Sequence, residues 1–347
     1  MKKSVPIIFT GGVMKISSRG GPGVLLAVCV ALSTPVLADE YVRPQWWPSP
    51  WGADDQRGAL NRLTPAKVLE ATALIKSGQI YDLGRVFEED MPLFDLTPGH
   101  RKFTLSVPGA PSWGPMGENR LAWNEDDISG HITQDGTQMD SLAHMATVRG
   151  KAGDLNELRY YNGLSHAEIG GGRGFKKLGA EHITPIFTRG VLIDIAGLKG
   201  RMLERGEEIS VADIKAALQR QGLGADSIRP GDALLYNTGW GSLWKTDNSK
   251  FNSGTPGLSI AAGDWMVKKQ VVLVGTDNWA VEAIPNPDPK WFAPNHQKFL
   301  VENGIYIIEN MDFSALIAAR AYEFAFVVGS LPIKGATGSP VRPFAIR

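Results

Sequence analysis

Near the middle of the chain the sequence reads Gln134-Asp-Gly-Thr-Gln-Met-Asp-Ser-Leu-Ala-His144. In an extended strand, Gln134, Gln138 and Asp140 would point to one face, and Gly136 on that face has no side chain to fill the space between them. Amide and carboxylate oxygens suit hard cations, and imidazole suits Zn or Mn. The stretch therefore indicates a metal site, although the same spacing also occurs on a solvated helix face.

The end of this strand is left open by the sequence. Ser141-Leu-Ala-His144 could equally begin a helix, so that the strand would end at Asp140. His144 would then lie one helical turn beyond Asp140 and still close to the predicted site.

The stretch resembles the signature His-x-Gly-Thr-His-x-Asp-x-x-x-His of the cyclase family of metal-dependent hydrolases, which includes bacterial kynurenine formamidase and isatin hydrolase. Gly136, Thr137, Asp140 and His144 match it, whereas both ligand histidines are replaced by glutamine, at Gln134 and Gln138. This departure is similar to the Gln-x-x-x-Gln-x-Asp-x-x-x-His signature of trans-dienelactone hydrolase. The resemblance runs from about Trp51 to the C-terminus and is carried by further blocks at 189–194, 275–277, 296–300, 308–310 and 338–343.

The resemblance implies a metal centre completed near the C-terminus by His296 and Glu309. The implied ion is divalent, Zn or Mn, and its implied ligands are Gln134, Gln138, Asp140, His296 and Glu309. Glu309 follows the apolar run Ile305-Tyr-Ile-Ile308, and a carboxylate that ends a buried strand needs a cation or several donors. From the residues alone, His296 could also line a helix start and Glu309 could be a plain strand-end carboxylate.

The implied chemistry is attack of metal-activated water on a carbonyl. His144 matches the family's proton-shuttling histidine, and Glu309 is the second residue expected to act in catalysis. Thr137, Asn237 and Thr238 could orient the substrate or the ligands. Because an amide oxygen is usually a weaker ligand than imidazole, we expect the site to bind metal with reduced affinity and to hold a single ion. Two tightly bound metal ions per chain would contradict this expectation.

Aromatic residues could shape a pocket for a planar substrate. Trp240, Trp265, Trp279 and Trp291 lie on or near the blocks that carry the resemblance. Packing in the core is the alternative for at least two of the four.

The N-terminus resembles an export signal. Four basic residues precede the apolar run at 23–32, and Val36-Leu-Ala38 suits cleavage before Asp39. The run is too short to span a membrane, although a retained anchor is the alternative. We predict a signal peptide at 1–38, a Trp/Pro-rich arm at 39–60 that packs on the body or on a neighbouring subunit, a hydrolase domain at 61–347 and a periplasmic location.

Composition excludes several classes of function. The only cysteine, Cys29, lies in the predicted signal, so the mature chain has no thiol nucleophile or Cys-based zinc site. Removing residues 1–38 changes the balance from 36 basic and 36 acidic residues to 32 and 36. A net charge near −4 argues against a nucleic-acid partner. The expected partners are a small-molecule substrate and further copies of the chain in a homo-oligomer, with no membrane contact after signal removal.

Periodicity favours an α/β fold with some parallel pairing, because strands and helices alternate after residue 185. The resemblance implies a single-domain β/β/α swivelling-type fold with a mixed sheet and flanking helices. We expect 109–130 to be a long loop and 170–174 to be a surface turn rather than a phosphate loop. The expected helices are 64–78, 210–221, 259–269 and 295–302, and the expected strands are 81–87, 103–107, 190–196, 232–237, 271–275, 305–309 and 324–328.

The leading functional hypothesis is an exported metal-dependent hydrolase that opens a cyclic ester or amide, with lactones as the closest analogy. The first alternative is an arylformamidase or isatin-type amide hydrolase, which the replaced histidines disfavour. The second is a non-catalytic periplasmic binding protein on the same fold. A protein of that kind would have lost its catalytic activity. The chain retains four site residues, which argues against such a loss: Asp140, His144, His296 and Glu309.

Overall fold

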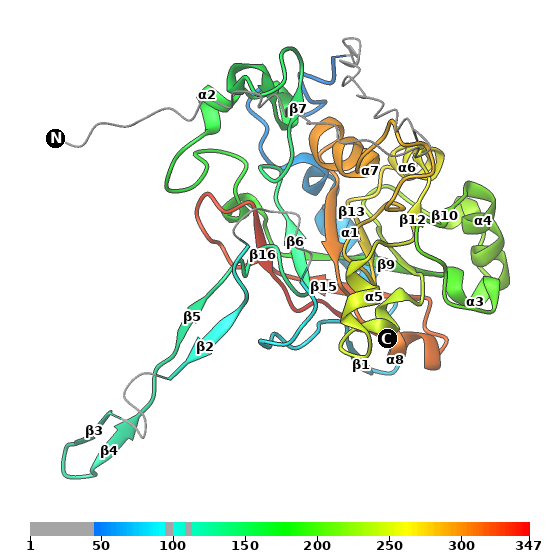
Figure 1. The fold of residues 1–347 in the computed structure, drawn as a ribbon. Coiled ribbons are helices and arrows are strands. Elements are labelled where there is room, and N and C mark those ends of the chain that lie inside the picture. The colour runs from blue at the N-terminus through cyan, green and yellow to red at the C-terminus, as the bar shows by residue number, and fades with distance from the viewer. Residues whose placement is uncertain (1–44, 94–99, 108–112) are drawn as a thin grey trace, which may run out of the picture. The chain divides into compact units, whose positions relative to one another are not determined.

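The computed structural model describes residues 45–93, 100–107 and 113–347 (Figure 1). The predicted signal at 1–38 and the first part of the predicted arm lie outside these residues. Within the described ranges, no helix has the length and apolar character needed to cross a membrane.

A nine-stranded mixed sheet forms the centre of the fold. Its four central strands, β9, β11, β13 and β14, run parallel, and the strands on both sides are antiparallel. In spatial order the strands are β1 (Ile80–Asp82), β17 (Phe344–Ile346), β15 (Glu323–Val328), β9 (Ile186–Asp194), β11 (Ala233–Asn237), β13 (Leu273–Thr276), β14 (Tyr306–Glu309), β6 (Gln138–Asp140) and β16 (Gly338–Pro340). The predicted α/β class with a mixed sheet is confirmed, and the swivelling-type designation stays a prediction.

Helices flank this sheet, as the sequence predicted. Ser210 caps α4 by accepting a hydrogen bond from the amide of Asp213, and Asp213 accepts one in return from the amide of Ser210. The α-helices are α1 (Pro65–Thr72), α2 (His166–Ile169), α3 (Ile195–Lys199), α4 (Val211–Arg220), α5 (Asn248–Asn252), α6 (Ile260–Lys268), α7 (Pro294–His296) and α8 (Ser314–Ala318). The other helical turns are η1 (Gly58–Arg62), η2 (Leu155–Glu157), η3 (Tyr161–Gly163), η4 (Ala180–His182), η5 (Ala225–Ser227), η6 (Trp240–Leu243) and the π-helical η7 (Gln297–Glu302).

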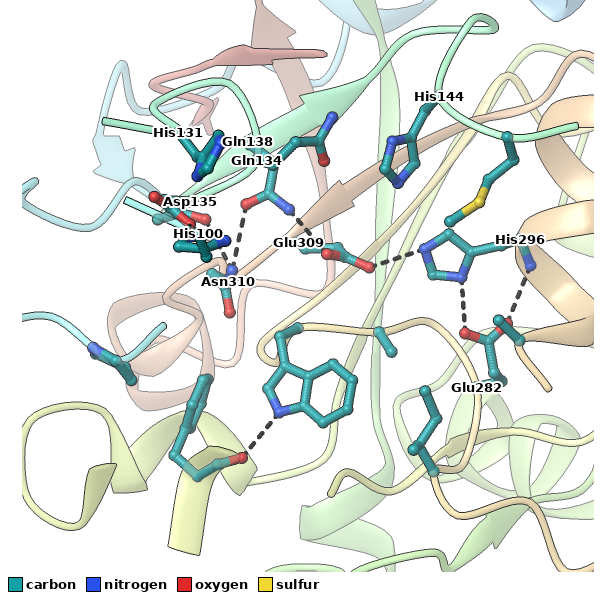
Figure 2. A pocket seen from close by; sticks show the side chains of 18 of the residues that line it. His100, His131, Gln134, Asp135, Gln138, His144, Glu282, His296, Glu309 and Asn310 are labelled. Carbon is teal, nitrogen blue, oxygen red and sulfur yellow. Dashed lines mark hydrogen bonds and ion pairs between the residues drawn. The ribbon is translucent and has the colours of Figure 1, made fainter. Parts of the chain in front are cut away.

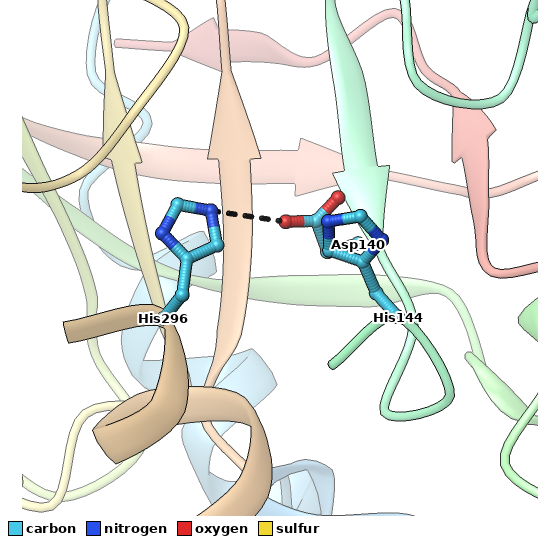
Figure 3. Close-up of side chains that lie close together, drawn as sticks. All are labelled: Asp140, His144 and His296. Atoms are coloured by element: carbon cyan, nitrogen blue, oxygen red, sulfur yellow. Dashed lines mark ion pairs between the residues drawn. The ribbon is translucent and has the colours of Figure 1, made fainter. Parts of the chain in front are cut away.

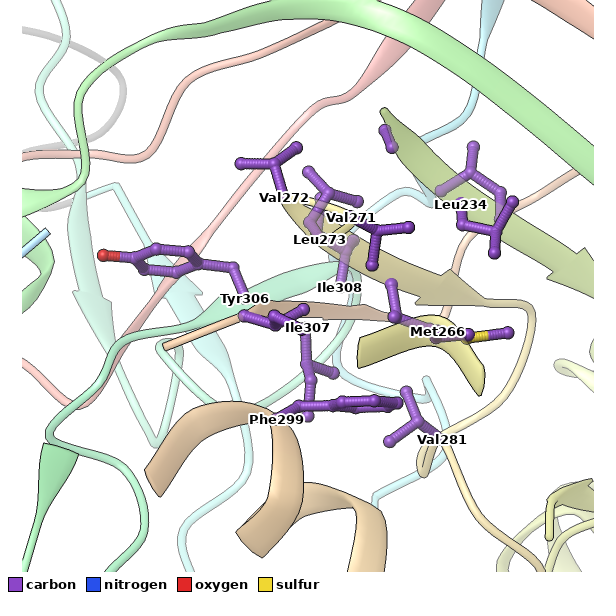
Figure 4. Packing of buried hydrophobic residues seen from close by; sticks show 14 of the residues in the cluster. Leu234, Met266, Val271, Val272, Leu273, Val281, Phe299, Tyr306, Ile307 and Ile308 are labelled. Carbon is purple, nitrogen blue, oxygen red and sulfur yellow. The ribbon is translucent and has the colours of Figure 1, made fainter. Parts of the chain in front are cut away.

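The central strands are buried on both faces, which explains their nearly continuous apolar sequences. Figure 4 shows Phe299 of η7 and Met266 of α6 packed near Ile307 of β14. This packing holds α7, which carries His296, against the end of β14, which carries Glu309. The core therefore fixes the distance between two predicted site residues.

The prediction of a loop at 109–130 is wrong for residues 113–130, and residues 109–112 lie outside the described residues. Two antiparallel pairs form a projecting ribbon instead, β2 (Thr104–Ser106) with β5 (Asp127–Ser129) and β3 (Trp113–Met116) with β4 (Leu121–Trp123). Gly114, Pro115 and Gly117 interrupt the alternation of polar and apolar residues that would have indicated strands. Two further small pairs are β7 (Thr147–Val148) with β8 (Leu158–Arg159) and β10 (Glu208–Ile209) with β12 (Gly257–Leu258).

Other expected boundaries need smaller corrections. The first helix ends at Thr72 instead of reaching Gly78, and the strand expected at 81–87 covers only Ile80–Asp82. Residues 171–174 are exposed and form a turn, as predicted. The described part of the arm packs on the body, because Trp46 donates its indole N–H to the carbonyl of Tyr160 and Arg62 stacks on Trp51.

A buried ion-pair network fastens α1 to the sheet. Asp232, which precedes β11, is fully buried and accepts hydrogen bonds from Lys67 of α1 and from Arg189 of β9. Arg189 also donates to Glu323 of β15 at 2.6 Å. Loss of the Asp232 carboxylate would leave two buried cations without this partner.

We predict that Asp232→Ala lowers the free energy of unfolding by about 3–5 kcal/mol, because breaking a buried pair leaves uncompensated charge. The control is Asp226→Ala, since Asp226 is fully exposed and forms a surface ion pair with Lys269 at 3.2 Å. The control should change stability by less than about 1 kcal/mol. Urea denaturation measures both, and equal effects would contradict the role of the network.

Candidate metal centre

Three side chains converge beside the carboxyl end of β14. Asp140, His144 and His296 each offer a ligand atom, and these atoms lie within 4.8 Å of one another (Figure 3). Asp140 ends β6, His296 ends α7, and His144 lies in the turn after β6, where its amide donates to the carbonyl of Ser141 at 3.0 Å. The sequence predicted Asp140 and His296 as ligands and placed His144 nearby as a proton shuttle, and the structure brings all three together.

Glu309 lies next to this cluster. Its Oε1 is 3.2 Å from Nε2 of His296, and Oδ2 of Asp140 is 3.8 Å from the same nitrogen. The register of β14 against β6 places Glu309 opposite Gln138, and Ile307 opposite Asp140. The two carboxylates therefore approach one imidazole from neighbouring strands.

The donor set fits a divalent cation. Asp140 is 1% exposed, and neither of its carboxylate oxygens has a hydrogen-bond partner among the described residues. Oε1 of Glu309 likewise lacks a hydrogen-bond partner among the described residues, and it forms an ion pair with Nε2 of His296 at 3.2 Å. Buried carboxylate oxygens need compensation, and an ion bound by oxygen and imidazole donors would supply it.

The protonation of the cluster follows from burial and from neighbouring charges. Burial lowers the pKa of His144, and Asp140 only partly opposes this, so His144 is neutral near pH 7. Burial alone would lower the pKa of His296, but Glu282 and Glu309 raise it well above its usual value. Burial raises the pKa of Glu309. The proton on His296 offsets part of the negative charge of these carboxylates. A bound cation would offset the same charge and would displace that proton.

Glu282 was not predicted from the sequence, although it orients His296. It is fully buried, and its Oε1 lies 2.7 Å from Nδ1 of His296 (Figure 2). Its Oε2 accepts hydrogen bonds from the backbone amides of Asn295 and His296, both at 3.0 Å. A proton on Nδ1 leaves Nε2 facing Asp140 and Glu309 as a ligand atom. The signal in the sequence was a lone carboxylate in the apolar run Ala280-Val-Glu-Ala-Ile284, the same argument that singled out Glu309.

The two predicted glutamine ligands make hydrogen bonds within the chain. The amide nitrogen of Gln138 donates to Oε2 of Glu309 at 2.8 Å, and its oxygen accepts from Asn310 at 3.3 Å. The amide nitrogen of Gln134 donates to Thr337 at 3.2 Å. Gln138 thus orients Glu309, and the role of both glutamines as metal ligands stays a prediction.

The single extended strand expected from Gln134 to Asp140 is incorrect, because β6 begins only at Gln138. Gly136 has a φ of +63°, which favours glycine, and a Cβ there would lie 2.6 Å from the ring of Phe87. Glycine is needed for this turn and for the contact with Phe87, not to open space between ligands.

The cluster lies at one side of a cavity of about 360 Å³. Met145, Phe251, Trp279, Ile284 and Phe292 contribute apolar walls, and Trp279 is the one member of the predicted tryptophan set that lines it. Trp240 is fully buried and belongs to the same apolar cluster as Trp279 and Phe251, but it does not line the cavity. Thr137, Asn237 and Thr238, expected to orient substrate, are not among the lining residues and hydrogen bond to Asn310, Asp194 and Asp277 respectively.

A second polar group, also missed from the sequence, lines the same cavity. Nε2 of His100 lies 2.9 Å from Oδ1 of the buried Asp135, and the rings of His100 and His131 are 4.5 Å apart. Burial raises the pKa of Asp135 to about 6. Figure 2 shows this group on the far side of Gln138 and Asn310 from His296. The cavity therefore has two polar ends joined by apolar walls.

Comparison with known sequences supports one family. Residues 81–283, more than half of the chain, match the sequence model of the family described as "Putative cyclase". The chain belongs to this cyclase family. No curated protein sequence matches the chain.

Solved structures agree with this membership in the cyclase family. A crystal structure described as a novel cyclase is 30% identical with a TM-score of 0.71, over 86% of this chain and 98% of that one. Isatin hydrolase A from Ralstonia solanacearum is 19% identical with a TM-score of 0.55, over 82% and 98% of the two chains. Isatin hydrolase A from Labrenzia aggregata, solved with benzyl benzoate, is 19% identical with a TM-score of 0.52, over 79% and 94%. The two isatin hydrolases share the fold with this cyclase-family chain.

We predict that Glu282→Gln weakens Zn or Mn binding by roughly 10–100-fold. The side-chain oxygen of the new glutamine would still accept hydrogen bonds from the two backbone N–H groups. The NH2 group of the same side chain would face Nδ1 of His296 and so place the ring proton on Nε2. Isothermal titration calorimetry measures the affinity, with Glu207→Gln as control because Glu207 pairs with the surface residue Arg201. Unchanged affinity in Glu282→Gln would contradict the orienting role.

Proposed function

We propose that this cyclase-family protein is a metal-dependent hydrolase that opens a cyclic ester or amide. The observation that carries the proposal is the convergence of Asp140, His144 and His296 at the side of a cavity, where the buried Asp140 oxygens have no hydrogen-bond partner in the described part of the chain. Family membership supports the same reading. The expected ion is Zn or Mn, because the donors are imidazole and carboxylate.

The substrate class rests on the shape and lining of the cavity. A volume of about 360 Å³ with Trp279 and Phe251 in its walls suits a small planar ring. The Gln134–Gln138 pair is similar to the signature of trans-dienelactone hydrolase, which favours a lactone over an amide. A cyclic amide is the second candidate, because the fold is shared with two isatin hydrolases.

The chain's own residues supply three parts of the mechanism. Asp140, His296 and Glu309 would hold the ion, with Glu282 and Gln138 fixing two of these side chains. When bound, a divalent cation lowers the pKa of water and polarises a carbonyl. His144, whose lowered pKa keeps it neutral, accepts a proton from the attacking water and returns it to the leaving oxygen or nitrogen. The apolar walls exclude bulk water from this exchange.

Export is part of the proposal. The basic residues, the apolar run at 23–32 and Val36-Leu-Ala38 support a signal peptide and a periplasmic location. The small-molecule substrate is the expected partner, and the net charge after signal removal argues against nucleic acid.

The proposal is tested by metal content, measured by plasma mass spectrometry after incubation with Zn or Mn and desalting. We expect roughly one equivalent in the wild type and loss of most of it in Asp140→Ala, with Asp226→Ala unchanged. The metal-loaded protein should then hydrolyse members of a panel of lactones and cyclic amides. A wild-type protein that retains no metal would contradict the proposal and would favour the alternative of a non-catalytic binding protein.

His144 provides the sharper test of mechanism, since it could bind the ion or move protons. For a proton shuttle, His144→Asn should lower kcat by about 100-fold or more while metal content stays within about twofold of wild type. Metal content and turnover are measured on the same preparation. Parallel loss of metal and activity would instead make His144 a ligand.

A further inference from the structure

The end of the cavity remote from the candidate metal centre carries buried polar atoms without partners. His100, Asp135 and Asn310 line the cavity there. The side chains of His100 and Asp135 are 8% and 2% exposed, and Asn310 is 5% exposed. Nε2 of His100, Oδ2 of Asp135 and Oδ1 of Asn310 have no hydrogen-bond partner among the described residues. Because buried polar atoms are nearly always paired, three unpaired ones in a cavity wall indicate that a ligand supplies their partners.

His131 adds a hydrogen-bond donor to the same end of the cavity. Its Nδ1 accepts a hydrogen bond from the backbone amide of Arg101 at 2.8 Å. Burial, together with the neighbouring His100 and Arg101, lowers the pKa of His131, so the ring is neutral near pH 7 and carries its proton on Nε2. The neutral ring has no lone pair left for a cation. It can therefore only donate, from Nε2, to a ligand in the cavity that it lines.

The donors and acceptors at this end select one kind of ligand group. Oδ2 of Asp135 and Oδ1 of Asn310 are acceptors, whereas Nε2 of His131 is a donor. A hydroxyl group both donates and accepts, so it can pair with a carboxylate and with an imidazole N–H together. A carboxylate ligand only accepts, and the buried carboxylate of Asp135 would repel it. A hydrocarbon edge would leave the protein atoms unpaired, which costs binding free energy.

We propose that this polar end recognises a hydroxyl group on the substrate ring, on the side away from the bond that is hydrolysed. The proposal rests on the hydrolase function proposed above and narrows its substrate to a hydroxyl-bearing lactone or cyclic amide. The carbonyl of such a ring lies beside His296 and Glu309, and its hydroxyl lies beside Asp135 and His131. Figure 2 shows these two groups on opposite sides of Gln138. The apolar walls between them contact the faces of the ring, so the polar ends set its orientation.

Isothermal titration calorimetry with chromans tests this recognition alone, because a chroman is a cyclic ether with no ester or amide bond to hydrolyse. The probes are chroman, its positional hydroxychromans and its carboxychromans, each titrated into metal-loaded protein. The best hydroxychroman should bind the wild type about 10–100-fold more tightly than chroman. The carboxychromans should bind no more tightly than chroman.

Asp135→Asn keeps the size of the side chain but replaces one acceptor oxygen by NH2 and removes the charge. It should remove most of the preference for hydroxychroman, while the Kd for chroman stays within about twofold of wild type. The control is Asp226→Asn at the fully exposed Asp226, which should keep the full preference. A hydroxychroman bound through the metal ion would keep its advantage in Asp135→Asn, and that result would overturn the proposal.

His131→Asn gives a second test that does not depend on how Asp135→Asn folds. The new side-chain oxygen can still accept from the amide of Arg101, but the donor at Nε2 is lost. We expect hydroxychroman to bind about tenfold more weakly and chroman to bind as before. Equal binding of the three probe classes by the wild type, tighter binding of a carboxychroman, or equal weakening of all probes in both variants would each overturn the proposal.

The chroman titrations also separate this proposal from the hydrolase function. Discrimination among the chromans in a protein that opens no lactone or cyclic amide would support the hydroxyl site and contradict the hydrolase function. Turnover of lactones at equal kcat/KM with and without a ring hydroxyl would support the hydrolase function and overturn the hydroxyl site.

Discussion

Three buried carboxylates surround the single imidazole of His296, and the candidate site depends on this arrangement. Glu282 lies 2.7 Å from Nδ1, while Glu309 and Asp140 lie 3.2 and 3.8 Å from Nε2. An uncompensated buried carboxylate costs several kcal/mol, so positive charge among the carboxylates, or a proton on one of them, stabilises this group. One proton on His296 cannot balance three carboxylates. A divalent cation bound by Asp140, His296 and Glu309 would compensate the charge and would use carboxylate oxygens that have no hydrogen-bond partner among the described residues.

The glutamines alter how this charge is held. In the family signature that the chain resembles, the positions of Gln134 and Gln138 are occupied by histidine. Here the two ends of the Gln138 amide connect Glu309 to Asn310, so a neutral side chain fixes the orientation of a charged one. An amide does not titrate, and acid sensitivity is therefore confined to the histidines and carboxylates of the cluster. This arrangement is consistent with a site that holds one ion more weakly than a site made with two further imidazoles.

The sequence predicted those parts of the structure in which local pattern and tertiary packing agree. The central strands were evident as apolar runs because both of their faces are buried, and α4 was evident from Ser210 and Asp213 at its start. Asp140, His144, His296 and Glu309 were identified from motif and resemblance. Glu282 was missed because its contact with His296 depends on how the segment after β13 meets α7. The pairing of His100 with Asp135 likewise joins residues that no local spacing relates, and the ribbon was missed because Gly and Pro interrupt its pattern.

The most direct measurement is an anomalous difference map from crystals of the protein grown with Mn or Zn, with data collected at the absorption edge of the ion. The account predicts one dominant peak among Asp140, His296 and Glu309, within about 2.0–2.3 Å of a carboxylate oxygen and of Nε2 of His296. A map with no peak there, or with its main peak elsewhere in the cavity, would contradict the assignment of these residues as the metal centre.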